Sequence, residues 1–198
     1  MTANPLSVSQ QWQARVDAEL SNAASNFERL RAHTKTISAA ADLMVATLRA
    51  GGKILLCGNG GSAADAQHLA AEFMARYRKN REPLAALALT VDTSALTAIA
   101  NDFSFDDVFE RQVRGLGRRG DLLIAISTSG NSKNVIKAVE AAKSIGIGTA
   151  ALTGGSGGRL AAIADLAICV PSERTNEIQE MHIAVGHILC GIVEDTLC

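Results

Sequence analysis

Hydrophobic positions in the first fifty residues follow a helical period. Apolar side chains recur in steps of three and four at Trp12, Val16, Leu20, Ala23, Phe27 and Leu30, which predicts an amphipathic helix. A second helix is predicted from about Ile37 to the glycine pair at 51–52, where glycine is a usual helix stop. The stripe on the first helix either packs on its own subunit or meets a partner. A long helix that carries the only tryptophan favours oligomerisation, so residues 1–50 are interpreted as an oligomerisation element.

After residue 52 the pattern changes to short apolar runs that alternate with helical segments. The runs cover 54–57, 87–89, 122–126, 148–152 and 166–170, and helices are predicted over 62–77, around Ala95 and Val108, and over 133–145 and 177–195. Continuous apolar runs between helices are typical of a parallel sheet covered on both faces. Residues 51–198 are therefore predicted to form one α/β domain, a doubly wound, flavodoxin-like sheet of five strands. Its ligand should bind at the carboxyl ends of the strands.

Composition excludes several classes of protein. The chain has 198 residues, with 19 Lys+Arg against 20 Asp+Glu, and this balance argues against binding to nucleic acid or to an anionic membrane. No apolar run reaches the roughly 18 residues of a membrane helix, and residues 1–6 lack a secretory signal. Three of the four cysteines lie in apolar runs, as expected of buried free thiols in a reducing cytoplasm.

A glycine-rich loop follows the first apolar run, over residues 57–62. Glycine lets the backbone turn sharply and approach a ligand closely, and Ser62 with Asp65 resembles a helix capping box. The loop fits a dinucleotide fingerprint loosely, but Asp92 follows too late for the usual acidic residue, and no Gly-Lys-Ser/Thr is present for a Walker loop. A capped turn without a ligand is an equal alternative for this loop taken alone.

A second loop, which we call the serine loop, covers residues 127–132 directly after the third of these runs. Four hydroxyls stand in it, on Ser127, Thr128, Ser129 and Ser132, at the predicted start of a helix. Free backbone N–H groups and the positive end of a helix dipole favour a phosphate at such a place. The serine loop is therefore predicted to bind a phosphate, with a simple capped turn as the less favoured alternative.

Metal-capable and acid–base residues lie on two of the predicted helices. His68 and Glu72 are four residues apart and share one face, and Gln179, His182 and His187 interrupt an otherwise apolar final helix. The two histidines of that helix face roughly opposite sides, so at most one should belong to a site. A lone histidine on an apolar helix is usually a core residue, and a His-x-x-x-Glu pair alone is weak evidence for a functional site. The combination of these residues with two phosphate-type loops is stronger evidence.

Four collinear segments resemble the sugar isomerase (SIS) superfamily and, within it, the phosphoheptose isomerases. They are residues 57–68, 96–102, 126–132 and 178–182, and the resemblance covers nearly the whole chain. It implies conversion of sedoheptulose 7-phosphate to D-glycero-D-manno-heptose 7-phosphate, the first step towards the heptose of lipopolysaccharide or related surface glycans. It also implies a homotetramer with active sites shared between subunits, and one Zn²⁺ per subunit.

The resemblance also assigns roles to residues of this chain. Phosphate would be held by Ser127, Thr128, Ser129 and Ser132, and the sugar would be lined by Asn59, Gly60, Gly61, Ser62, Glu72, Asn101, Asp102 and Gln179. Zinc would be bound by His68, Glu72, Gln179 and His187, with Glu72 and His187 as the acid–base pair. A continuous helix separates the backbones of Gln179 and His187 by about 12 Å, so Gln179 is the less secure ligand.

Two other functions compete with the enzyme. A related SIS-domain protein binds the replication initiator DnaA without catalysis, and by the family pattern it lacks the equivalents of Glu72 and His187. This chain has both residues, which favours the isomerase. A sugar-phosphate-sensing module would need an effector domain, for which the sequence offers no further residues.

Overall fold

The computed structural model describes residues 7–198, so the expectation about a secretory signal in residues 1–6 lies outside the described part. Five parallel strands form one sheet in the order β2-β1-β3-β4-β5. The strands are β1 (Ile54–Cys57), β2 (Ala86–Ala88), β3 (Leu122–Ile126), β4 (Gly148–Gly154) and β5 (Leu166–Val170). This order reverses direction between β1 and β3, so the predicted doubly wound, flavodoxin-like sheet is confirmed.

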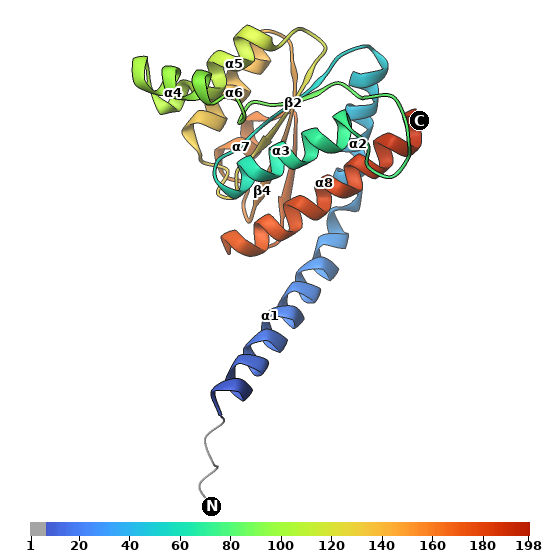
Figure 1. Ribbon diagram of the computed structural model, residues 1–198, viewed down its shortest axis with the longest axis vertical. Coiled ribbons are helices and arrows are strands. Elements are labelled where there is room, and N and C mark those ends of the chain that lie inside the picture. The colour runs from blue at the N-terminus through green and yellow to red at the C-terminus, as the bar shows by residue number, and fades with distance from the viewer. Residues whose placement is uncertain (1–6) are drawn as a thin grey trace, which may run out of the picture.

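Helices cover both faces of the sheet (Figure 1). They are α1 (Val8–Leu30), α2 (Thr34–Arg49), α3 (Gly61–Met74), α4 (Thr93–Asp102), α5 (Val108–Leu116), α6 (Lys133–Ser144), α7 (Gly158–Ile163) and α8 (Thr175–Leu197), with 3-10 turns at Arg31–His33 and Phe105–Asp107. Alternate residues of the strands point to opposite faces, and each face is apolar. Both layers of helices are needed because the central strands are buried throughout.

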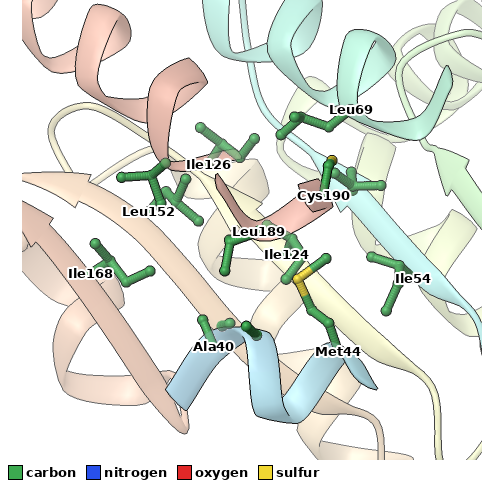
Figure 2. Packing of buried hydrophobic residues seen from close by; sticks show 14 of the residues in the cluster. Ala40, Met44, Ile54, Leu69, Ile124, Ile126, Leu152, Ile168, Leu189 and Cys190 are labelled. Carbon is green, nitrogen blue, oxygen red and sulfur yellow. The ribbon is translucent and has the colours of Figure 1, made fainter. Parts of the chain in front are cut away.

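One face of the sheet packs against α2, α3 and α8. Ile54, Ile124 and Leu152 from the strands meet Met44 of α2 and Leu189 of α8 in this core (Figure 2). The opposite face, with Leu55 and Leu123, packs against α5 and α6. The core consists mainly of Ala, Leu, Ile and Val, as expected from a chain with 4% aromatic residues.

The structure differs from the sequence prediction at a few boundaries. The third predicted helix ends at Met74 rather than at about residue 77, and β4 continues to Gly154. Helix α7 was not predicted, because six residues are too short to display a helical period. The cysteines are free, with Cys57 and Cys190 buried, Cys169 half-buried and Cys198 exposed. Among the described residues no helix is both long enough and apolar enough to cross a membrane.

Helix α1 extends away from the domain (Figure 1). Its C-terminal part is attached through the amides of Asn22 and Asn26, which donate to the Glu177 carboxylate at 2.6 and 3.0 Å. Its N-terminal half is exposed, including Trp12 and Val16 of the predicted apolar stripe. Leu30, at the end of the stripe, is buried in the core, so only the N-terminal part of the stripe does not pack on the body of its own chain.

Candidate active site

The glycine-rich loop and the serine loop lie side by side, because they follow the neighbouring strands β1 and β3. Together with the start of α8 they enclose a cavity of about 250 Å³. Predicted site residues line it: Asn59, Gly60, Gly61, Ser62, Ser127, Thr128, Ser132 and Gln179, together with Thr175. A second cavity, of about 280 Å³, shares Thr128 and Thr175 with the first and is also lined by Ser129. The loops therefore form a polar site at the point where the strand order reverses.

Backbone geometry at the glycine-rich loop starts α3 earlier than predicted. Gly60 is the N-cap and has a φ of 54°, a left-handed conformation that favours glycine. Helix α3 begins at Gly61, and no side chain caps it, so the predicted capping box of Ser62 and Asp65 is wrong. Ser62 lies inside the first turn instead. A Cβ at Gly61 would overlap the amide of Gln179, so glycine is required there for α8 to approach.

The serine loop presents hydroxyls at the start of α6. Ser132 is the N-cap but makes no capping hydrogen bond, and its Oγ pairs with Ser127 Oγ at 2.9 Å. The Ser129 hydroxyl accepts from the Asn131 N–H at 3.2 Å. A helix N-terminus without a side-chain cap keeps N–H groups and a partial positive charge for an anion. The loop therefore suits a phosphate without using Lys or Arg.

Two reciprocal amide hydrogen bonds fix the spacing of the loops. Asn59 and Asn134 each donate Nδ2 to the other's Oδ1 at 2.9 Å. Asn59 was predicted to line the sugar, but the role of Asn134, on the first turn of α6, was not foreseen. The serine loop is thereby held in place relative to the glycine-rich loop.

Three side chains converge between α3 and α8. His68 Nε2 lies 3.3 Å from Glu72 Oε1 and 2.8 Å from His187 Nε2. One ligand atom from each residue falls within 4.8 Å of the others, and His68 is exposed. Two imidazole nitrogens and a carboxylate oxygen form a donor set that zinc accepts, with a fourth position left for a further ligand. These residues therefore fit the metal that the family resemblance implies.

His182, the other histidine of α8, is fully buried in the core. The prediction that at most one of the two histidines reaches the site agrees with this placement.

Asp65, on α3, lies one turn before His68. Burial raises the pKa of Asp65, the positive charge available to His68 opposes this, and the carboxylate oxygen Oδ2 has no hydrogen-bond partner among the described residues.

Other predicted residues lie apart from the three-residue cluster. Gln179 is two turns before His187 on the continuous helix α8 and packs against Gly61, in the first cavity. Asn101 and Asp102 end helix α4, where both are exposed and Asn101 donates to the Asp102 carboxylate at 2.9 Å. Neither of these two lines either cavity within the described chain. Their assignment to the sugar stays a prediction.

Sequence reasoning missed Thr175 and Tyr77. Thr175 lines both cavities, and it was overlooked because α8 was predicted to begin at residue 177. The Tyr77 ring stacks on His187, with centroids 5.8 Å apart and planes 21° apart. Tyr77 lies 110 positions from His187 in the chain, and no local pattern signals this contact.

Comparison with known proteins agrees with the fold. The sequence model of the SIS domain family matches residues 20–154. A phosphoheptose isomerase of Rhodospirillum rubrum is 58% identical over 176 residues, covering 89% of this chain and 94% of the relative. The solved structure of phosphoheptose isomerase GmhA from Neisseria gonorrhoeae is 48% identical, with a TM-score of 0.89, covering 93% of this chain and 99% of that one. A phosphoheptose isomerase structure from Francisella tularensis, 36% identical, also has a TM-score of 0.89, covering 92% and 98% of the two chains.

The doubly wound sheet, with its hydroxyl-rich loop at the switch point, defines a SIS domain. Identity above one half extends over most of the chain, beyond the segment that the domain model matches. The chain belongs to the phosphoheptose isomerase family.

Proposed function

We propose that this protein is an aldose–ketose isomerase that converts sedoheptulose 7-phosphate to D-glycero-D-manno-heptose 7-phosphate, an early step in making the heptose of surface glycans. The observation that carries the proposal is the His68–Glu72–His187 cluster beside a hydroxyl-lined pocket at a helix N-terminus. Membership of the phosphoheptose isomerase family supports the choice of substrate.

The serine loop would bind the phosphate. Ser127, Thr128, Ser129 and Ser132 supply hydroxyl donors, and the start of α6 supplies backbone N–H groups and the dipole. The glycine-rich loop and Gln179 face the same space and would contact the sugar hydroxyls. Asn101 and Asp102 remain candidates for the sugar when the substrate is bound.

The rise along α3 from Gly61 to His68 is comparable to the length of a heptose phosphate. Helices α3 and α8 both start at the pocket, and His68 follows Gly61 by about 10 Å along α3. An open-chain seven-carbon sugar with a terminal phosphate is also about 10 Å long, given bonds of about 1.5 Å. With the phosphate in the serine loop, the C1–C2 end would therefore reach the cluster.

Glu72 and His187 are the proposed acid–base pair. Glu72 would take the proton from C1 of the ketose, and His187 would donate a proton to the carbonyl oxygen on C2, giving an enediol. Return of a proton to C2 and loss of the proton on the C1 oxygen then give the aldose. His68 contacts both groups and would keep them facing one another.

Zinc is the metal we propose for this cluster, held by His68, Glu72 and His187, with Gln179 as a further ligand if its amide turns from Gly61. When bound, a divalent metal polarises the carbonyl and orients the diol. The two imidazoles and the carboxylate support this choice over Mg²⁺ or Ca²⁺, which favour oxygen ligands.

We also propose a homotetramer in the cytoplasm, in which residues 1–50 form the oligomerisation element beside the domain of residues 51–198. The exposed stripe of α1 supports association with further copies, and the exposure of His68 leaves room for a neighbouring subunit to complete the site. Four free cysteines and a net charge of −1 support a reducing compartment and no affinity for membrane or nucleic acid.

Glu72→Gln tests the function and the role of Glu72 together. The variant keeps the shape of the side chain but not its basicity, so turnover of sedoheptulose 7-phosphate should fall at least 100-fold, with the fold intact by circular dichroism. Glu140→Gln, on the outer face of α6, is the matched control and should turn over normally. The assay identifies the product by NMR with zinc added, and again with a chelator.

Deuterium oxide as solvent tests the enediol. The wild-type product should carry solvent deuterium at C2, because the base exchanges its proton before returning it. Near-normal turnover by Glu72→Gln would refute its role. No turnover by the wild type with zinc present would refute the isomerase and favour a binding protein.

A further inference from the structure

A buried ion pair joins the segment after α3 to helix α8. Arg81 Nε lies 3.0 Å from Glu194 Oε1, and the two side chains are 4% and 1% exposed. The same carboxylate accepts the backbone N–H groups of Tyr77, Arg78 and Lys79 at 3.0, 2.8 and 3.0 Å. Glu194 thus receives four hydrogen bonds, and it fixes the backbone of this segment on α8.

Arg81 also holds the C-terminal end of α3. Its Nη2 donates to the Glu72 carbonyl and its Nη1 to the Phe73 carbonyl, both at 2.8 Å. The last carbonyls of a helix have no partner within the helix, so the last turn frays unless other donors meet them. Glu72 stands two residues before the end of α3 at Met74. Arg81 therefore holds the backbone from which the Glu72 side chain extends.

Tyr77 extends this arrangement to the other catalytic candidate. Its backbone is held by Glu194, and its ring stacks on the His187 imidazole. His68 contacts the same imidazole edge-on, with centroids 5.0 Å apart. Glu194 lies seven residues after His187, two turns further along α8 and on the same face. One buried carboxylate is thus linked to Glu72 through Arg81 and to His187 through Tyr77.

We propose that Arg81 and Glu194 are a positioning pair that sets Glu72 against His187 for proton transfer, with Tyr77 fixing the plane of the His187 ring. The proposal rests on the isomerase function given above. Stability alone does not account for the pair, since a buried ion pair is often no more stabilising than apolar side chains of similar volume. The Arg81 guanidinium donates through Nε to a carboxylate and through both Nη groups to two helix-end carbonyls, so the pair fixes geometry instead.

Glu194→Gln is the central variant, and its neighbour Asp195→Asn is the matched control. Asp195 pairs with Lys79 at the surface, so the control removes the adjacent charge without touching the buried pair. Loss of a supporting residue of this kind costs about 10- to 100-fold. We expect kcat of Glu194→Gln to fall by that factor, with KM for sedoheptulose 7-phosphate changed less than about threefold because the serine loop is untouched. Asp195→Asn should match the wild type.

Tyr77 is the only tyrosine in the chain, so protein labelled with ¹³C-tyrosine gives one set of ring signals. In the wild type these signals should be displaced by the His187 ring and should shift when zinc is added. In Glu194→Gln they should move to the positions of a free tyrosine. This measurement needs no turnover. A wild type that is inactive on the sugar would refute the function, and the tyrosine signals would still decide whether the pair positions the ring.

Three further variants test the proposal if the Glu194→Gln protein does not fold. Arg81→Lys keeps the charge but loses the fork, and it should lower kcat and displace the tyrosine signals in the same way. Tyr77→Ala should lower kcat, and Tyr77→Phe, which retains the ring, should restore most of it. Unchanged tyrosine signals in Glu194→Gln or Arg81→Lys, or a kcat within twofold of the wild type in a folded variant, would overturn the proposal.

Discussion

His182 shows what burial does to a single titratable side chain. It has no exposed surface, and neither ring nitrogen makes a hydrogen bond of good geometry among the described residues. Desolvation lowers the pKa of His182 to about 4, and the backbone of Thr153, which faces the ring without reaching hydrogen-bonding geometry, only partly opposes the shift. The fold therefore keeps this imidazole neutral.

The lowered pKa predicts a pH-dependent stability. Below pH 6.5 the unfolded chain binds a proton at His182 that the folded chain refuses until about pH 4. Stability is therefore full above pH 6.5 and falls as the pH drops towards 4, by about 2 kcal/mol at pH 5. Urea unfolding at pH 7.5 and 5.0 measures the difference.

A paired substitution isolates the contribution of this side chain. Between pH 7.5 and 5.0, the free energy of unfolding of His182→Leu should fall by about 2 kcal/mol less than that of the wild type. His33→Gln, outside the sheet, should behave as the wild type. The attribution to His182 is wrong if the Leu variant declines as steeply as the unmodified chain.

Helices, strands and loops differ in how far the sequence predicts them. Strands β1, β3, β4 and β5 are predictable, because buried parallel strands must be continuous apolar runs. The two loops are predictable too, because glycines or hydroxyls directly follow such runs. The Arg81–Glu194 pair is not predictable, since its partners are 113 residues apart and meet only through the packing of α3 on α8. Local periodicity likewise cannot place α1, because the N-terminal part of its apolar stripe is exposed while Leu30 at the other end is buried in the core.

At the scale of elements, the serine loop and the start of α6 should act as one phosphate site. Ser129→Ala removes one hydroxyl donor, and a hydrogen bond to a charged group contributes about 1.5–3 kcal/mol. KM for sedoheptulose 7-phosphate should therefore rise about 10- to 100-fold, with a smaller effect on kcat. Steady-state kinetics measures both constants.

The opposite end of α6 supplies the control. Ser144→Ala removes a hydroxyl that donates to the Ala141 carbonyl at 2.7 Å, far along the helix from the serine loop. It should leave KM unchanged. Equal KM values for the Ser129 and Ser144 variants would count against the serine loop as the phosphate site.

The whole molecule is incomplete as a single chain. Trp12, Val16 and Leu20 are 59%, 56% and 64% exposed on a helix that points away from the domain (Figure 1). The Asn22 and Asn26 hydrogen bonds to Glu177 fix only the base of α1. An apolar stripe of this kind on a helix attached at one end is suited to packing against the same helix of other copies.

Charges on the stripe should therefore dissociate the assembly. The double variant Val16→Glu with Leu20→Glu should reduce the mass by light scattering from about four times 20.7 kDa to a smaller species. Ala14→Glu with Ala18→Glu adds the same charge on the opposite face of α1 and should leave the mass unchanged. Emission of Trp12, the only tryptophan, should shift to longer wavelength in the stripe variant alone, because its ring becomes solvated. Turnover should fall with the mass if a neighbouring subunit completes each active site. A stripe variant that keeps both the full mass and the tryptophan emission of the wild type would show that α1 does not join the subunits.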